Sequence, residues 1–152
     1  MAAPRPVSRG GLDTGALDRE FSRADVEFVG LDHSGASFEG RVFLNNASAD
    51  ETTERTVEAG YAGTFHVFGH GGCLGEAGHC DVHPRRLYDP RPAHPLTPGR
   101  KVVIATEAVR RAVAGGGPLL VTVVPVVRSV TPKAPAREDL LRFDSVRVVT
   151  YR

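Results

Sequence analysis

The residues best suited to chemistry lie in one glycine-rich stretch near the middle of the chain. Within fourteen residues the sequence places two thiols and three imidazoles, at His70, Cys73, His79, Cys80 and His83. Thiolate and imidazole are the ligands that Zn²⁺ and Cu⁺ prefer in proteins. The interspersed glycines allow a backbone to turn closely around an ion. The stretch is therefore a candidate copper or zinc site.

The spacing of the two cysteines also fits simpler states. Six residues separate Cys73 from Cys80, whereas zinc modules usually place about two to four residues between paired cysteines. A Cys73–Cys80 disulfide, worth about 2.5 kcal/mol by chain entropy, is the favoured interpretation, although a reducing cytosol disfavours it. Two free thiols and a metal site stay open as alternatives.

Enzymatic chemistry has weaker support in the sequence. Cys80 is next to His79 in the sequence, and a histidine can activate a thiol. No third group that could orient the imidazole is recognisable, however. The motifs of serine hydrolases, phosphate-binding loops, dinucleotide-binding folds and zinc proteases are missing. We therefore predict no catalytic residue and no obligatory cofactor. An enzyme of unrecognised type, with its site in residues 69–99, remains an alternative.

Composition narrows the class of protein further. The chain has 152 residues, of which 41% are hydrophobic, enough for the core of one domain. Its 19 basic and 18 acidic residues nearly cancel, which argues against nucleic-acid binding. There is no apolar run of ~18 residues to span a membrane, and no apolar segment typical of a secretory signal near Met1. These features predict a cytoplasmic protein that binds neither nucleic acids nor membranes.

The elements that must position these residues are mostly strands. Alternating apolar residues predict strands from Val26, over 38–44, 61–68, 100–105 and 119–127, and within 141–151. One short helix is predicted over 106–113, with Thr106 as its N-cap and three glycines from Gly115 ending it. Pro125 indicates an edge position or a bulge. This order predicts an all-β fold, an antiparallel sandwich or barrel of about six to seven strands with one helix.

The pattern also predicts the domain boundary and the core. Residues 1–24 contain scattered prolines and glycines and few large apolar side chains, so we expect a flexible arm before a single domain over 25–152. Residues 47–58 are polar and predict an exposed connection. Tyr61 is expected on the same strand face as Phe65. The predicted core comprises Phe28, Phe43, Phe65, Val67, Val121, Val123 and Phe143.

Several short motifs resemble a known domain. These are Ala62-Gly-Thr-Phe65 at a strand start, the helix beginning Thr106-Glu-Ala-Val, and Val121-Thr-Val-Val-Pro-Val126 in a late strand. Their order over residues 25–152 resembles the C-terminal β-domain that follows the dicopper domain in plant polyphenol oxidases, molluscan haemocyanins and bacterial tyrosinase-family proteins. The plant domains have no counterpart of the Cys/His stretch.

The resemblance implies an accessory role. In that family the β-domain is a sandwich that shields the copper site, holds no copper ligand and does no chemistry. A dicopper site needs six histidines on paired helices, whereas the six histidines of this chain fall on predicted strands and loops, at His33, His66, His70, His79, His83 and His94. The resemblance thus implies a non-catalytic domain whose partner is a dicopper oxidase. A small copper- or zinc-binding protein that uses residues 70–83 is the alternative.

Overall fold

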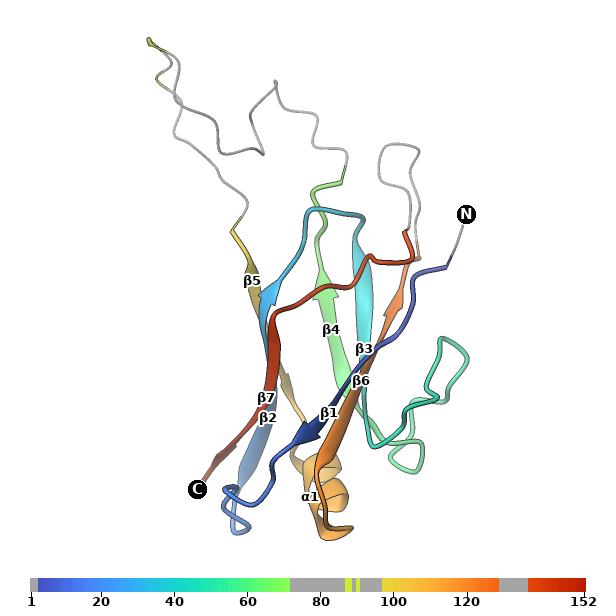
Figure 1. Ribbon diagram of the computed structural model, residues 1–152, viewed down its shortest axis with the longest axis vertical. Coiled ribbons are helices and arrows are strands. Elements are labelled where there is room, and N and C mark those ends of the chain that lie inside the picture. Colours follow the sequence, from blue (N-terminus) through green and yellow to red (C-terminus); the bar gives the residue numbers. More distant parts are fainter. Residues whose placement is uncertain (1–2, 72–86, 89, 91–96, 129–136) are drawn as a thin grey trace.

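The fold is a sandwich of two antiparallel β-sheets (Figure 1). A computed structural model describes residues 3–71, 87, 88, 90, 97–128 and 137–152. In these residues seven strands and one helix follow one another as β1 (Val7–Leu12), β2 (Arg23–Leu31), β3 (Phe38–Leu44), β4 (Tyr61–Val67), β5 (Gly99–Ile104), α1 (Thr106–Ala114), β6 (Leu119–Val126) and β7 (Ser145–Tyr151). The all-β prediction is confirmed, and the sheets form a sandwich because they do not close into a barrel.

The two sheets differ in size. The larger has the strand order β1-β6-β3-β4, and the smaller has the order β5-β2-β7. All neighbouring pairs are antiparallel. Helix α1 lies at one end of the sandwich, and the connection from β2 to β3 lies at the other (Figure 1). Residues 33 and 70 therefore reach the same end, although they are far apart in the sequence.

The core between the sheets is built around aromatic rings. Phe28, from the central strand of the smaller sheet, lies 5.0 Å from Phe65 and 5.3 Å from Phe143 between ring centroids. Gly40 of β3 faces Phe65, and a Cβ at Gly40 would lie only 2.4 Å from that ring. All seven side chains predicted to be in the core are buried.

One predicted core residue is buried on the other side of its sheet. Phe43 packs with Val124, Ala49 and Tyr61 in a separate cluster beneath the connection from β3 to β4. That connection is largely exposed, but Ala49 is 3% exposed and helps to cover the sheet. The prediction that placed Tyr61 on the face of Phe65 is wrong. A register shift opposite Val42 and Phe43 turns Tyr61 to the outer face.

The N-terminal segment departs from the predicted loose arm because it contains a strand. Strand β1 pairs with β6, and the hydroxyl oxygens of Ser8 and Thr122 lie 2.8 Å apart. Its middle residues lack apolar side chains, and the pairing is irregular beside Gly11, whose φ is 73°. Because the strand depends on hydrogen bonding to β6, the pattern of apolar residues did not reveal it.

The start of helix α1 differs by one residue from the prediction and is attached to a strand. The predicted N-cap is wrong by one residue, because the cap position is Ala105 and Thr106 begins the helix. The Thr106 hydroxyl instead accepts a hydrogen bond from the Ala24 N–H at 3.1 Å, which attaches α1 to β2.

Pro125 of β6 lies at a position that has a neighbouring strand on one side only. The pairing of β6 with β1 ends at the pair Val7–Val123, whereas Pro125 is still paired with Gly40 of β3. The missing N–H of the proline therefore faces the side without a neighbouring strand.

Replacement of Phe65 tests the core. Phe65→Ala should lower the free energy of unfolding by about 3–5 kcal/mol, because it removes a ring packed against Phe28 and leaves a cavity. Phe68→Ala is the matched control, since Phe68 lies just beyond the same strand and is 83% exposed. Chemical denaturation measures both. Equal stabilities of the two variants would show that the assigned strand register is wrong.

Candidate functional site

The structure describes one of the five predicted ligands, His70. Cys73, His79, Cys80 and His83 lie outside the described residues, as does the predicted disulfide. His70 follows β4, and its N–H donates a 2.8 Å hydrogen bond to the carbonyl of His33. The next residue, Gly71, donates a 2.7 Å hydrogen bond to the Gly35 carbonyl. The beginning of the predicted site is thereby attached to the turn that connects β2 and β3.

His33 is a neighbour of His70 that sequence analysis did not include in the site. The two Nδ1 atoms lie 3.1 Å apart, and the rings are nearly perpendicular at 75°. On its other side, Nε2 of His33 lies 2.6 Å from the Thr97 carbonyl oxygen. The order of the strands could have indicated this contact. Because β3 and β4 are antiparallel, the end of β4 lies beside the turn that precedes β3.

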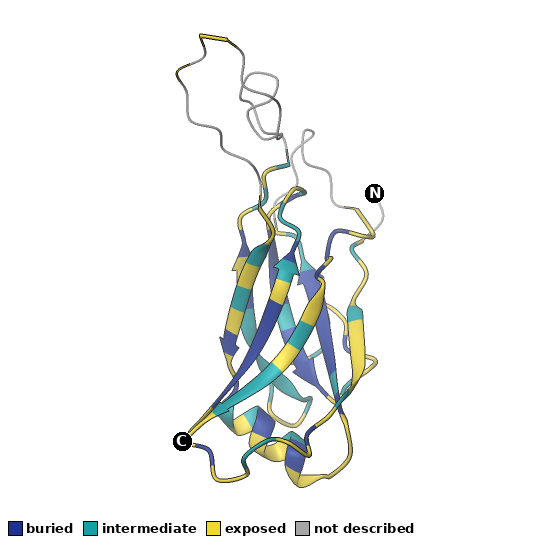
Figure 2. Ribbon diagram, turned by 60° about the vertical axis from the view of Figure 1, so that its left-hand side comes forward, coloured by how far each residue is buried: buried dark blue, intermediate teal, exposed yellow. Residues whose placement is uncertain are grey.

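The outer face of the smaller sheet presents a second candidate, an apolar surface. Cross-strand pairing places the alternate residues of β2, β5 and β7 on this face. Exposed positions occur along the strands of this sheet (Figure 2). The large apolar residues among them are Val29, Val102, Ile104 and Tyr151. We call this set, together with Arg23, Arg100 and Arg147, the smaller-sheet face. Aromatic and arginine side chains are enriched in protein interfaces.

A buried carboxylate organises the centre of this face. Glu27 is 3% exposed although it points away from the core. Arg100 and Arg147, from the two flanking strands, cover it and donate hydrogen bonds of 2.6 Å and 2.7 Å to its two oxygens. The hydrogen bond from Arg147, followed by that from Arg100, lowers the pKa of Glu27 below its ordinary value. A negative charge at Glu27 thus holds two half-exposed guanidinium groups on the surface.

A neighbouring pair extends the same arrangement. Arg23 donates two hydrogen bonds of 2.7 Å to the carboxylate of Asp25, which is 1% exposed. Its guanidinium carbon also lies 5.4 Å from the centroid of the Tyr151 ring. The face therefore combines fixed arginines with exposed apolar groups, an arrangement suited to binding and without a paired acid and base.

The larger sheet also carries a buried carboxylate on its outer face, and arginines bind it there. Glu39 is bound by Arg41 at 2.8 Å and by Arg128 at 3.0 Å, while His66 lies 4.0 Å away. The hydrogen bond from Arg41 lowers the pKa of Glu39 most, and Arg128 adds to the effect. Nearby, Phe43 lies under the connection from β3 to β4. The apolar part of this outer face is therefore already covered by the chain itself.

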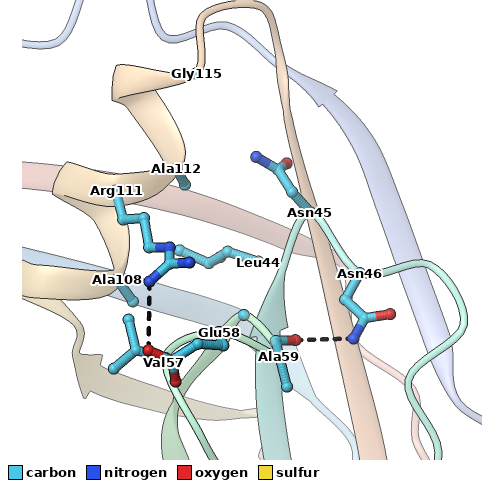
Figure 3. A pocket seen from close by; sticks show the side chains of 11 residues that line it. Leu44, Asn45, Asn46, Val57, Glu58, Ala59, Ala108, Arg111, Ala112 and Gly115 are labelled. Atoms are coloured by element: carbon cyan, nitrogen blue, oxygen red, sulfur yellow. Dashed lines mark hydrogen bonds and ion pairs between the residues drawn. The ribbon is translucent and has the colours of Figure 1, made fainter.

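A hollow of about 290 Å³ lies between helix α1 and the connection that precedes β4 (Figure 3). Its polar side chains are already engaged. Asn45 accepts a hydrogen bond from the Leu120 N–H at 3.0 Å, and Asn46 donates one to the Ala59 carbonyl at 2.8 Å. Arg111 and Glu58 face each other at 3.7 Å on its rim. The hollow contains no nucleophile with an adjacent base.

In the part of the chain that the structure describes, no group of three or more His, Cys, Asp or Glu side chains is placed to hold a metal ion. No helix there has both the length and the apolar character needed to cross a membrane. The candidates are therefore the histidine pair at the loop end and the smaller-sheet face.

The role of Glu27 can be tested through the pH dependence of stability. Because folding lowers its pKa from about 4.5, the stabilisation is present above that pH and is lost as the pH falls through the folded pKa. Glu27→Gln should lower the free energy of unfolding at pH 7 by about 1–2 kcal/mol. It should also make that free energy less dependent on pH below about pH 4.5, where the carboxylate of the unmodified chain takes up its proton.

Glu58→Gln is the matched control, because it removes the same charge from a side chain that is 77% exposed. Urea denaturation at a series of pH values provides the measurement. If Glu27→Gln retained the full pH dependence of the unmodified chain, Glu27 would not contribute to acid unfolding and the assigned ion pairs would be wrong.

No protein-family model, curated protein or solved structure matches this chain. The candidate functions therefore come from the histidine pair, the smaller-sheet face and the motifs in the sequence.

Proposed function

We propose that this protein is a non-catalytic binding domain that docks on a partner protein through the smaller-sheet face. The observation that carries the proposal is the grouping of Val29, Val102, Ile104 and Tyr151, all at least 37% exposed, on one face of one sheet. Covering these side chains would remove apolar surface from water, which is the main driving force of protein association.

The arginines define the chemistry of the partner surface. Arg100 and Arg147 are 55% and 61% exposed, while each also holds Glu27. Their positions are therefore fixed before binding, which reduces the entropy lost on association. A complementary surface has an apolar centre and a rim of carboxylates or carbonyl oxygens that accept hydrogen bonds from these guanidinium groups.

A dicopper oxidase is the partner that the sequence motifs favour. The β-sandwich architecture supports this assignment, because the resemblance described above implies a sandwich that covers a copper site. In this role the chain would act in the cytoplasm, shielding the catalytic domain of the oxidase and contributing no copper ligand to it. Docking would place the smaller-sheet face against the oxidase and limit the access of phenols to its copper site.

Charge substitution tests the docking surface. Val102→Asp combined with Ile104→Asp should weaken binding to the catalytic domain of a dicopper oxidase from the same source at least tenfold. The reason is that two carboxylates would have to be buried in an apolar contact. Val57→Asp is the control, since Val57 is similarly exposed but lies in the connection between β3 and β4. Titration calorimetry measures all three chains, and equal affinities would rule out this surface.

The absence of intrinsic oxidase chemistry is a separate prediction. The isolated chain, supplied with Cu²⁺, should not oxidise catechols or monophenols, because the one helix among the described residues contains no histidine. Oxygen uptake and quinone absorbance provide the assay. Copper-dependent turnover that survived purification and disappeared after replacement of histidines by alanine would contradict the non-catalytic proposal.

A further inference from the structure

We propose that His33 and His70 form a binding site for a divalent transition-metal ion, Cu²⁺ or Zn²⁺, at the loop end of the sandwich. The site is separate from the smaller-sheet face and does not depend on the proposed docking. It consists of two imidazoles from different segments, one in the turn after β2 and one directly after β4. Imidazole nitrogen is a good ligand for both ions.

The distance between the ring nitrogens fits two ligands of one ion. The Nδ1 atoms of His33 and His70 are 3.1 Å apart. Metal–nitrogen bonds of about 2.0–2.1 Å at a tetrahedral angle place two ligand nitrogens roughly 3.3 Å apart. A small adjustment of either ring would therefore allow both nitrogens to bind one ion. The ring centroids are 4.9 Å apart and the ring planes are inclined at 75°, so the two rings do not stack face to face.

The hydrogen bond on the far side of His33 prepares its ring for this role. A carbonyl oxygen only accepts hydrogen bonds, so the 2.6 Å contact with Thr97 requires the proton of His33 on Nε2. In the neutral ring Nδ1 then carries a lone pair, and it is this atom that faces His70. Histidine ligands in metal sites commonly donate their second ring N–H to a carbonyl in this way.

The backbone holds the two segments together without an ion. The His70 N–H donates to the His33 carbonyl, and the Gly71 N–H donates to the Gly35 carbonyl. The Gly69 N–H donates to the Ser37 hydroxyl at 2.9 Å. A Cβ at Gly69 would lie 2.1 Å from the Gly35 carbonyl oxygen, so only glycine permits this close approach. Three hydrogen bonds thus bring the imidazoles together before an ion binds, which reduces the cost of assembling the site.

The two ligands among the described residues leave other coordination positions open. Water or a small ligand from solution can fill them, since the contacts of both rings lie at the surface. The competing explanation for the short contact is a direct hydrogen bond in which the Nδ1–H of His70 donates to Nδ1 of His33. These two explanations differ in a measurable way, because only the metal site requires both histidines for ion binding.

Titration of the full chain with Cu²⁺ and, separately, with Zn²⁺ tests the site. We expect one ion per chain, with the affinity reduced at least tenfold by His33→Gln and equally by His70→Gln. His66→Gln is the matched control and should bind like the unmodified chain, because His66 is an exposed histidine of β4. Wild-type affinity in either His33→Gln or His70→Gln would overturn the proposal.

Two further measurements keep the test decisive. The ion should still bind to the double variant Cys73→Ser, Cys80→Ser. Loss of binding in this variant would show that the thiols hold the ion, and it would overturn the proposal. Nitrogen-15 NMR of the imidazoles with Zn²⁺ should shift Nδ1 of both His33 and His70 while Nε2 of His33 stays protonated. If a glutamine variant fails to fold, this spectrum of the unmodified chain decides, and unshifted Nδ1 signals would overturn the site.

Discussion

The structure depends on the contact between the two sheets at Phe28. This side chain is fully buried on the central strand of the smaller sheet, and its ring meets Phe65 of the larger sheet and Phe143 beside β7. Aromatic pairs at such distances add to the stabilisation from apolar burial. They also fix the separation and the relative position of the sheets. The outer faces of the two sheets take their relative position from this contact.

The same contact determines what the smaller sheet presents outward. Successive strand residues point to opposite faces, so Phe28 in the core forces Glu27 and Val29 outward. An outward glutamate between two strands can be covered by arginines from both neighbours, and Glu27 is covered in this way. The exposed apolar side chains around it follow from the register of β5 and β7. The alternation of side chains along β2 therefore determines both the core packing and the proposed docking surface.

The sequence predicted those features that local alternation determines. Strands 38–44 and 61–68, the helix from Thr106 and the buried aromatic residues have periodic apolar patterns, and the structure confirms them. Features set by distant partners were missed. Strand β1 exists through its pairing with β6, and the outward position of Tyr61 follows from a register shift. Sequence spacing did not identify His33 as part of the candidate metal site, because His33 and His70 are 37 residues apart and meet only in the folded chain.

The close approach of Phe65 to Gly40 has a consequence for how this sequence can diverge. The ring occupies the space that any side chain at position 40 would need, and the two residues are paired across β3 and β4. A larger residue at position 40 is compatible with the fold only together with a smaller one at position 65. The two positions are therefore expected to covary among descendants of this chain, and each residue restricts the mutational paths open to the other.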